Sequence, residues 1–142
     1  MRLSKEFEVT ATRERASEVL AEDATLTSLF PDTRTDIVAR KGKRRTTKSV
    51  YKLLGQEGEA TFHFDAEAEG GVAFAKVCDG RVWKELTGRV TLAERGAKKV
   101  RVRIEMEGKT KAFVPEFTIK TPLQKQLDDM AAGLRRRMES RG

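Results

Sequence analysis

Apolar and polar side chains alternate without a break from residue 60 to residue 68, and this pattern restricts the possible folds more than any other feature. Apolar side chains stand at every second position, at Ala60, Phe62, Phe64, Ala66 and Ala68. A period of two is the period of a β-strand with one buried and one solvated face. The segment is therefore predicted to be a half-buried strand of an antiparallel sheet.

Two dipeptides predict how this strand continues. Gly70-Gly71 and Asp79-Gly80 suit two-residue hairpin turns, because both central positions of such turns need positive φ. With these turns Phe64 lies opposite Val77, and both turns place the same side chains on one face of the sheet. A slip of one residue at either turn would exchange the two faces of a strand.

Further strands are predicted on both sides of this segment. A later hairpin pairs Leu92 with Val100, so that the apolar face continues over four strands. Upstream, 33–39 and 44–54 resemble two strands of less certain phase, and 3–11 alternates with its apolar residues inward. Together these segments predict seven strands.

The remaining segments have helical periodicity. Two short amphipathic helices are predicted around 16–20 and 26–30, the second ending at Pro31. Thr121, Pro122 and Gln124 have the pattern of an N-cap, a first helical position and a capping box, so a long helix is predicted to begin near Pro122. The apolar residues of this helix lie on one face and must pack against another part of the protein. They are Leu123, Leu127, Met130, Ala131, Leu134 and Met138.

This order of elements resembles the helix-grip fold of the START and polyketide cyclase/dehydrase-like (SRPBCC) superfamily. Phe7-Glu8-Val9-Thr10-Ala11, Glu18-Val19-Leu20-Ala21 and Leu29-Phe30-Pro31 are similar to the superfamily's opening, although Ser17 replaces a common aromatic residue and Glu22 a common Asp. The resemblance implies an α+β domain over 1–142, with a seven-stranded antiparallel sheet curved around the last helix and a pocket for an apolar ligand. Carriers, cyclases, hydrolases and subunit-binding modules share this fold, so the fold does not decide the function.

Small residues predict where that pocket lies. The centre of the apolar face carries Ala66, Ala73, Ala75 and Gly88, which are too short to reach a covering helix, so either the helix packs very close or a cavity remains. The expected ligand-binding residues are Phe62, Phe64, Ala75, Lys84, Leu86, Gly88, Ile104, Met106, Leu127, Met130 and Leu134.

Lys84 is the one charged residue that this register turns inward. We interpret it as the polar anchor of the pocket. The alternatives are a lysine stem that reaches the edge of the sheet, or an ion pair with Asp128 or Asp129 on the last helix.

Composition excludes several kinds of site. The single cysteine, Cys78, allows no disulfide and no multi-cysteine zinc site, and no metal or other cofactor is expected. His63 opposite Cys78, and Asp65 opposite Lys76, are interpreted as surface pairs. The chain shows no apolar signal segment or membrane span, so a soluble, cytoplasmic protein is expected.

The chain carries a net charge of +7, and its densest basic segment would suit an anionic surface. That segment contains Arg40, Lys41, Lys43, Arg44 and Arg45. The favoured function is the binding, carrying or presenting of a hydrophobic small molecule such as a lipid or polyketide in an internal cavity. The alternatives are a cyclase/dehydrase-like enzyme acting on such a ligand, and a basic module docking on protein, RNA or an anionic membrane.

Overall fold

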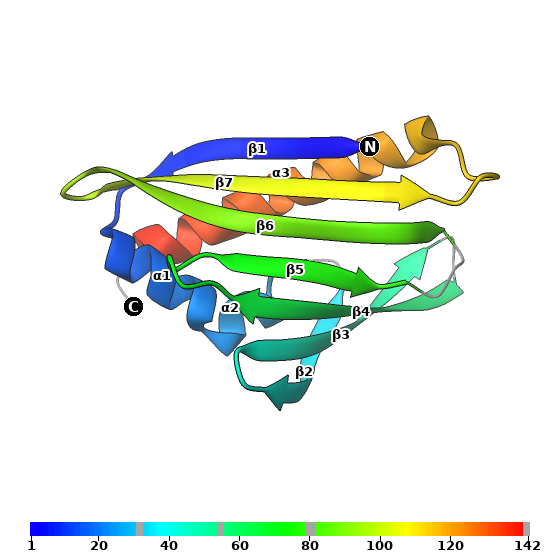
Figure 1. The fold of residues 1–142 in the computed structure, drawn as a ribbon, viewed down its shortest axis with the longest axis horizontal. Helices are drawn as coiled ribbons and strands as arrows, with labels where there is room; N and C mark the ends of the chain where they lie inside the picture. Colours follow the sequence, from blue (N-terminus) through cyan, green and yellow to red (C-terminus); the bar gives the residue numbers. More distant parts are fainter. Residues whose placement is uncertain (31–32, 54–55, 79–81, 141–142) are drawn as a thin grey trace.

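A computed structural model describes residues 1–30, 33–53, 56–78 and 82–140 of the chain (Figure 1). The described residues form one seven-stranded sheet in the order β1-β7-β6-β5-β4-β3-β2, with every neighbouring pair antiparallel. The strands are β1 (Arg2–Val9), β2 (Arg34–Lys41), β3 (Arg44–Leu53), β4 (Gln56–Ala66), β5 (Val72–Val77), β6 (Trp83–Gly96) and β7 (Lys99–Thr110). The helices are α1 (Arg13–Ala21), α2 (Asp23–Thr27) and α3 (Glu116–Glu139).

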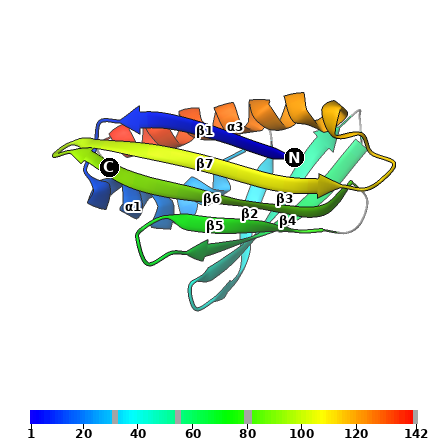
Figure 2. The same ribbon diagram turned by 45° about the horizontal axis from the view of Figure 1, so that its top comes forward.

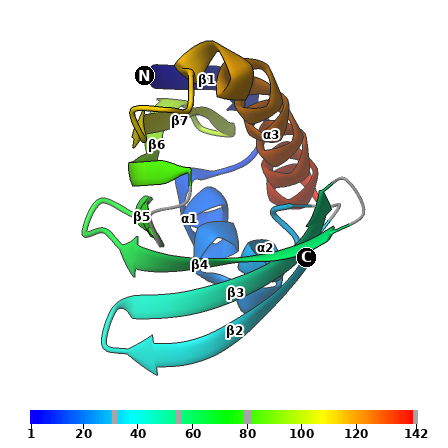
Figure 3. The same cartoon turned by 90° about the vertical axis from the view of Figure 1, so that its right-hand side faces the viewer.

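The sheet is strongly curved, and α3 lies on its concave side (Figures 2 and 3). α3 makes its close backbone approaches to β1, β7 and α1. All six residues of the apolar stripe predicted from residue 123 to residue 138 are buried. Their spacing of three and four residues keeps them on one face of the helix, where each side chain contributes about 1.5–3 kcal/mol by leaving water. The predicted helix-grip architecture is therefore confirmed.

The start of α3 differs from the prediction. The helix begins at Glu116, and Pro122 lies inside it. The backbone N–H and the hydroxyl of Thr118 both donate to the carbonyl of Pro115, at 3.1 and 2.7 Å. Two segments of the sequence have a proline followed by a good helix former, Pro115-Glu116 and Pro122-Leu123. The helix begins at the first of them. Pro122 costs the helix one internal hydrogen bond, because its nitrogen carries no hydrogen.

The β4–β5 hairpin also differs from the prediction. The Glu67 N–H donates to the Gly71 carbonyl and the Gly70 N–H to the Glu67 carbonyl, both at 3.0 Å, and Gly70 has φ of 97°. The turn therefore spans the three residues 68–70 instead of two. The resulting shift exchanges the faces of β5, so Phe64 lies opposite Phe74 and not opposite Val77.

Other sequence predictions have mixed outcomes. In β6 and β7, Leu92 pairs with Val102 instead of Val100, a shift of two positions that leaves the inward face unchanged. The inward orientation of β1 is confirmed, since Val9 is buried and Phe7 packs against the core. The second short helix, predicted around 26–30 with its end at Pro31, is α2 and already ends at Thr27, so this prediction is wrong. The predicted turn at Asp79-Gly80 lies outside the described residues.

Candidate ligand site on the concave face

Phenylalanine side chains form a layer on the concave face of the sheet. Phe62 and Phe64 on β4 and Phe74 on β5 have ring centroids 5.7–6.5 Å apart, and Phe30, which follows α2, lies 5.9 Å from Phe62. Such separations suit offset and edge-on aromatic contacts. Phe62 and Phe64 therefore face inward, as predicted. Phe74 is also buried, although the predicted register, with Ala73 and Ala75 inward, would turn it to the solvent face.

The predicted empty centre of the sheet is filled. An ideal Cβ at Gly88 would lie 2.2 Å from Cζ of Phe74, so the ring of Phe74 crosses β6 where Gly88 has no side chain. Gly58 and Gly108 lie in the same way beneath the rings of Tyr51 and Trp83, at 2.5 and 2.6 Å. The prediction that small residues leave a void at this point is therefore wrong, because aromatic rings from neighbouring strands cover the inward glycines.

Two predicted site residues point elsewhere. Ala75 pairs with His63 and Thr87 on the outer face, as a result of the changed β4–β5 turn. Lys84 is exposed, because a bulge between Trp83 and Glu85 reverses the alternation of β6 and turns Trp83 into the core. The interpretation of Lys84 as an inward anchor is therefore wrong.

A different lysine takes the inward position. Lys76 lies opposite Phe62 on the concave face and is half-buried, so the predicted surface pair of Asp65 with Lys76 is wrong. Asp65 instead receives two hydrogen bonds from Arg44, at 2.8 and 3.0 Å. Among the described residues no carboxylate forms an ion pair with Lys76. His63, predicted to face Cys78, contacts the Thr46 hydroxyl at 2.8 Å through Nδ1.

Buried hydroxyl groups border the phenylalanine layer. Thr35, Thr47 and Ser49 are buried, and the hydroxyls of Thr35 and Ser49 are 2.7 Å apart across β2 and β3. The register places Thr47 opposite Phe62 on the same face. This row was not predicted, because residues 43–49 are all polar and show no alternation that would set the phase of β3.

The other predicted site residues occupy the interior. Those of the sheet are Leu86, Ile104 and Met106, and those of α3 are Leu127, Met130 and Leu134; all are buried. With Phe62 and Phe64 they belong to one hydrophobic cluster, in which α3 faces the concave side of the sheet. The structure thus brings together an apolar interior, one row of hydroxyls and one half-buried lysine.

The basic hairpin between β2 and β3 is largely neutralised by its own surroundings. Arg40 pairs with Asp23, and Arg44 pairs with Asp65. The hydrogen bond from Arg40, together with the nearby Arg45, holds the pKa of Asp23 below its ordinary value, and Arg44 does the same for the pKa of Asp65. These contacts give no support to the prediction that this hairpin binds an anionic surface.

Arg45 has a structural role. Its guanidinium donates to the carbonyls of Leu20 and Ala21, each at 3.0 Å, and lies 3.5 Å from Asp23. These carbonyls end α1 and have no partner within the helix. We expect Arg45→Ala to lower the free energy of unfolding by about 1–3 kcal/mol in urea titrations, because two carbonyls would lose their donor. Arg44→Ala is the control and should change stability little, since its ion pair is exposed; equal losses in both variants would contradict this role.

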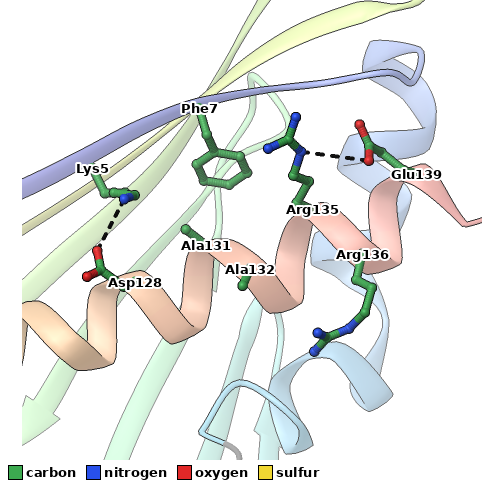
Figure 4. A pocket seen from close by; sticks show the side chains of 8 residues that line it. All are labelled: Lys5, Phe7, Asp128, Ala131, Ala132, Arg135, Arg136 and Glu139. Carbon is green, nitrogen blue, oxygen red and sulfur yellow. Dashed lines mark ion pairs between the residues drawn. The ribbon is translucent and has the colours of Figure 1, made fainter.

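A surface groove of about 370 Å³ runs between β1 and α3 (Figure 4). Its lining residues are Lys5, Phe7, Asp128, Ala131, Ala132, Arg135, Arg136 and Glu139. Lys5 pairs with Asp128 at 3.2 Å and Arg135 with Glu139 at 3.7 Å, and Lys5 lowers the pKa of Asp128. These two ion pairs cancel four of the five charges that line the groove, and Arg136 leaves one positive charge. In the described ranges no three His, Cys, Asp or Glu side chains gather to hold a metal, and no helix is apolar and long enough to span a membrane.

No family model and no curated protein matches the chain. Solved structures match over nearly its whole length. A START superfamily protein from Mycobacterium smegmatis has 20% identity and a TM-score of 0.77, with 97% of each chain covered.

Two further structures match in the same way. The Zhui aromatase/cyclase from Streptomyces sp. R1128 has 13% identity and a TM-score of 0.76, covering 98% of this chain and 91% of its own. A STAR-related lipid transfer protein from Xanthomonas axonopodis has 13% identity and a TM-score of 0.68, covering 98% and 86%. Identities this low establish the fold alone. The chain therefore has the START-like helix-grip fold, as the order of its predicted elements indicates.

Proposed function

We propose that the protein binds a hydrophobic small molecule with an anionic or carbonyl head, such as a lipid or a polyketide, between α3 and the concave face of β3, β4 and β5. The observation that carries this proposal is the layer of phenylalanine rings on β4 and β5, on the part of the sheet away from the close contacts of α3 with β1 and β7. Apolar ligands bind where apolar side chains surround a few well-placed polar groups.

Aromatic rings cover the centre of this face, where the ring of Phe74 lies over Gly88, so the ligand must displace side chains there. Phe62 and Phe74 are the side chains to move, because their rings lie at the centre of the layer. The hydroxyls of Thr35 and Ser49 and the ammonium of Lys76 would then contact the polar head of the ligand. That an aromatase/cyclase and a lipid transfer protein have the same fold supports a ligand of this class. We also infer that residues 1–142 act as a single domain, since their buried side chains form one cluster.

Titration with cis-parinaric acid, a fluorescent fatty acid, tests the proposal. The wild type should bind the acid saturably with one molecule per chain. Lys76→Met should weaken this binding about tenfold, because it removes a charge-assisted hydrogen bond to the carboxylate. Its melting temperature should stay the same or rise, since the variant no longer holds a half-buried charge.

Lys84→Met provides a matched control, because it makes the same chemical change on the outer face of the neighbouring strand. It should bind the acid as the wild type does. Equal affinities of both variants would reject Lys76 as the anchor, and absence of saturable binding by the wild type would reject the proposed function. Organic extraction of the purified protein followed by mass spectrometry then identifies the ligand that it carries.

A further inference from the structure

Two phenylalanine side chains at one end of the molecule are left in solvent. Phe113 is 76% exposed and Phe117 is 78% exposed. Phe113 lies in the connection from β7 to α3 and Phe117 in the first turn of α3, at the end where this connection projects beyond the sheet (Figures 1 and 3). Isolated exposed apolar residues are ordinary, but two aromatic rings on one short segment mark a contact surface.

Hydrogen bonds hold this segment in place. The Lys111 N–H donates to the Val82 carbonyl at 2.9 Å, and the Val114 N–H donates to the Lys111 carbonyl at 2.9 Å. The Thr110 hydroxyl donates to the Val114 carbonyl at 2.8 Å. The exposure of Phe113 is therefore a property of a hydrogen-bonded turn. Val82, the residue before β6 whose carbonyl accepts from Lys111, is itself 37% exposed.

The charges around the two rings are mostly positive. Lys109, Lys111 and Lys120 flank them in sequence, and the Lys111 ammonium lies 5.9 Å from the centre of the Phe113 ring. The one acid of residues 109–120, Glu116, lies 3.3 Å from the N-terminal ammonium and is thereby neutralised. Lys109 lies at the limit of ion pairing with Glu85, at 4.0 Å, which leaves Lys111 and Lys120 as the main sources of positive charge.

We propose that Phe113, Phe117, Lys111 and Lys120, called here the aromatic end, dock the protein on a bilayer that contains anionic phospholipids. Aromatic rings beside lysines suit the interface of such a bilayer, where the rings enter the acyl boundary and the ammonium groups contact lipid phosphates. A second copy of this chain fits less well, because pairing of two aromatic ends would bring like charges together. The aromatic end lies outside the proposed ligand site, so this inference stands without it.

Co-sedimentation with vesicles tests the inference. The wild type should bind vesicles of phosphatidylcholine and phosphatidylglycerol, and bind vesicles of phosphatidylcholine alone more weakly. Changing both rings, Phe113→Ser with Phe117→Ser, should reduce the partition coefficient about tenfold or more. Lys111→Glu with Lys120→Glu should reduce it as strongly, and raised salt should weaken wild-type binding. The melting temperature of both double variants should change little, because Phe113, Phe117 and Lys120 are exposed and Lys111 is only partly buried.

Two controls make the same changes elsewhere on the molecule. Val38→Ser replaces an apolar residue of β2 that is 55% exposed, and Lys41→Glu with Lys43→Glu reverses two charges of the basic hairpin. Both should keep most of the vesicle binding. Three results would overturn the inference: no binding by the wild type, equal losses in the controls, or a dimer of the wild type that the phenylalanine changes abolish.

Discussion

A chain that ends at Val114, and so lacks α3, is expected to aggregate and to show no cooperative thermal transition. α3 buries six apolar side chains, from Leu123 to Met138, against the sheet and α1. Removing such contacts withdraws on the order of 10 kcal/mol of hydrophobic stabilisation. The free energy of unfolding of a domain of this size is about 5–15 kcal/mol in total. A loss of this size therefore removes most or all of it.

Soluble yield and differential scanning calorimetry measure this outcome. A chain that ends at Ser140 retains all of α3 and is the matched control, which should melt cooperatively. The truncated chain also loses the contact of the N-terminal ammonium with Glu116, although that exposed pair contributes little. A soluble fragment of residues 1–114 with a cooperative transition would show that the sheet is stable without its helix.

Gly88→Ala is expected to destabilise the protein by about 1–3 kcal/mol, a large effect for the addition of one methyl group. The new Cβ would lie 2.2 Å from Cζ of Phe74 and 2.8 Å from the backbone carbonyl of Glu105. The ring of Phe74 can rotate away only by leaving its contacts with Phe62 and Phe64. The carbonyl of Glu105 belongs to β7 and moves only with the strand.

A double-mutant cycle identifies the cause. In a Phe74→Ala background the ring is absent, so Gly88→Ala should cost less there than in the wild type, and the two effects should not add. Gly96→Ala in the same strand is the control, because its nearest neighbour would be Cβ of Lys99 at 3.8 Å, an ordinary contact. Urea unfolding gives all four free energies. Strict additivity would show that the Phe74 ring does not cover Gly88.

The long helix α3 was predicted well, because its signal is spread over many residues. The stripe of α3 repeats every three or four positions, so an error in its start moves no residue to another face. The prediction placed the start at Pro122 instead of Glu116 and still assigned the buried face correctly. The order of elements followed from these long patterns, and it was enough to indicate the fold.

The orientation of single strand residues depends on local turns and bulges, and two such features decided the candidate site. The turn that ends at Gly70 has one residue more than predicted, which brought Phe74 and Lys76 inward and turned Ala75 outward. The bulge beside Trp83 removed Lys84 from the interior. The turn also contacts α1, from which Arg13 and Ser17 donate to the carbonyls of Glu69 and Gly70, and the bulge lies in the pairing of β6 with β7. The local sequence does not determine such distant partners. A glycine in an inward position therefore does not predict a cavity, because a ring from the next strand can cover it.

Intermolecular nuclear Overhauser effects (NOEs) between unlabelled cis-parinaric acid and 13C-labelled protein test the central claim most directly, since they locate the ligand. The account predicts NOEs from the acyl chain to Phe62 and Phe74 on the sheet and to Met130 on α3, all of which belong to the interior. NOEs confined to the aromatic end, or to the groove that contains Phe7 and Ala132, would contradict it.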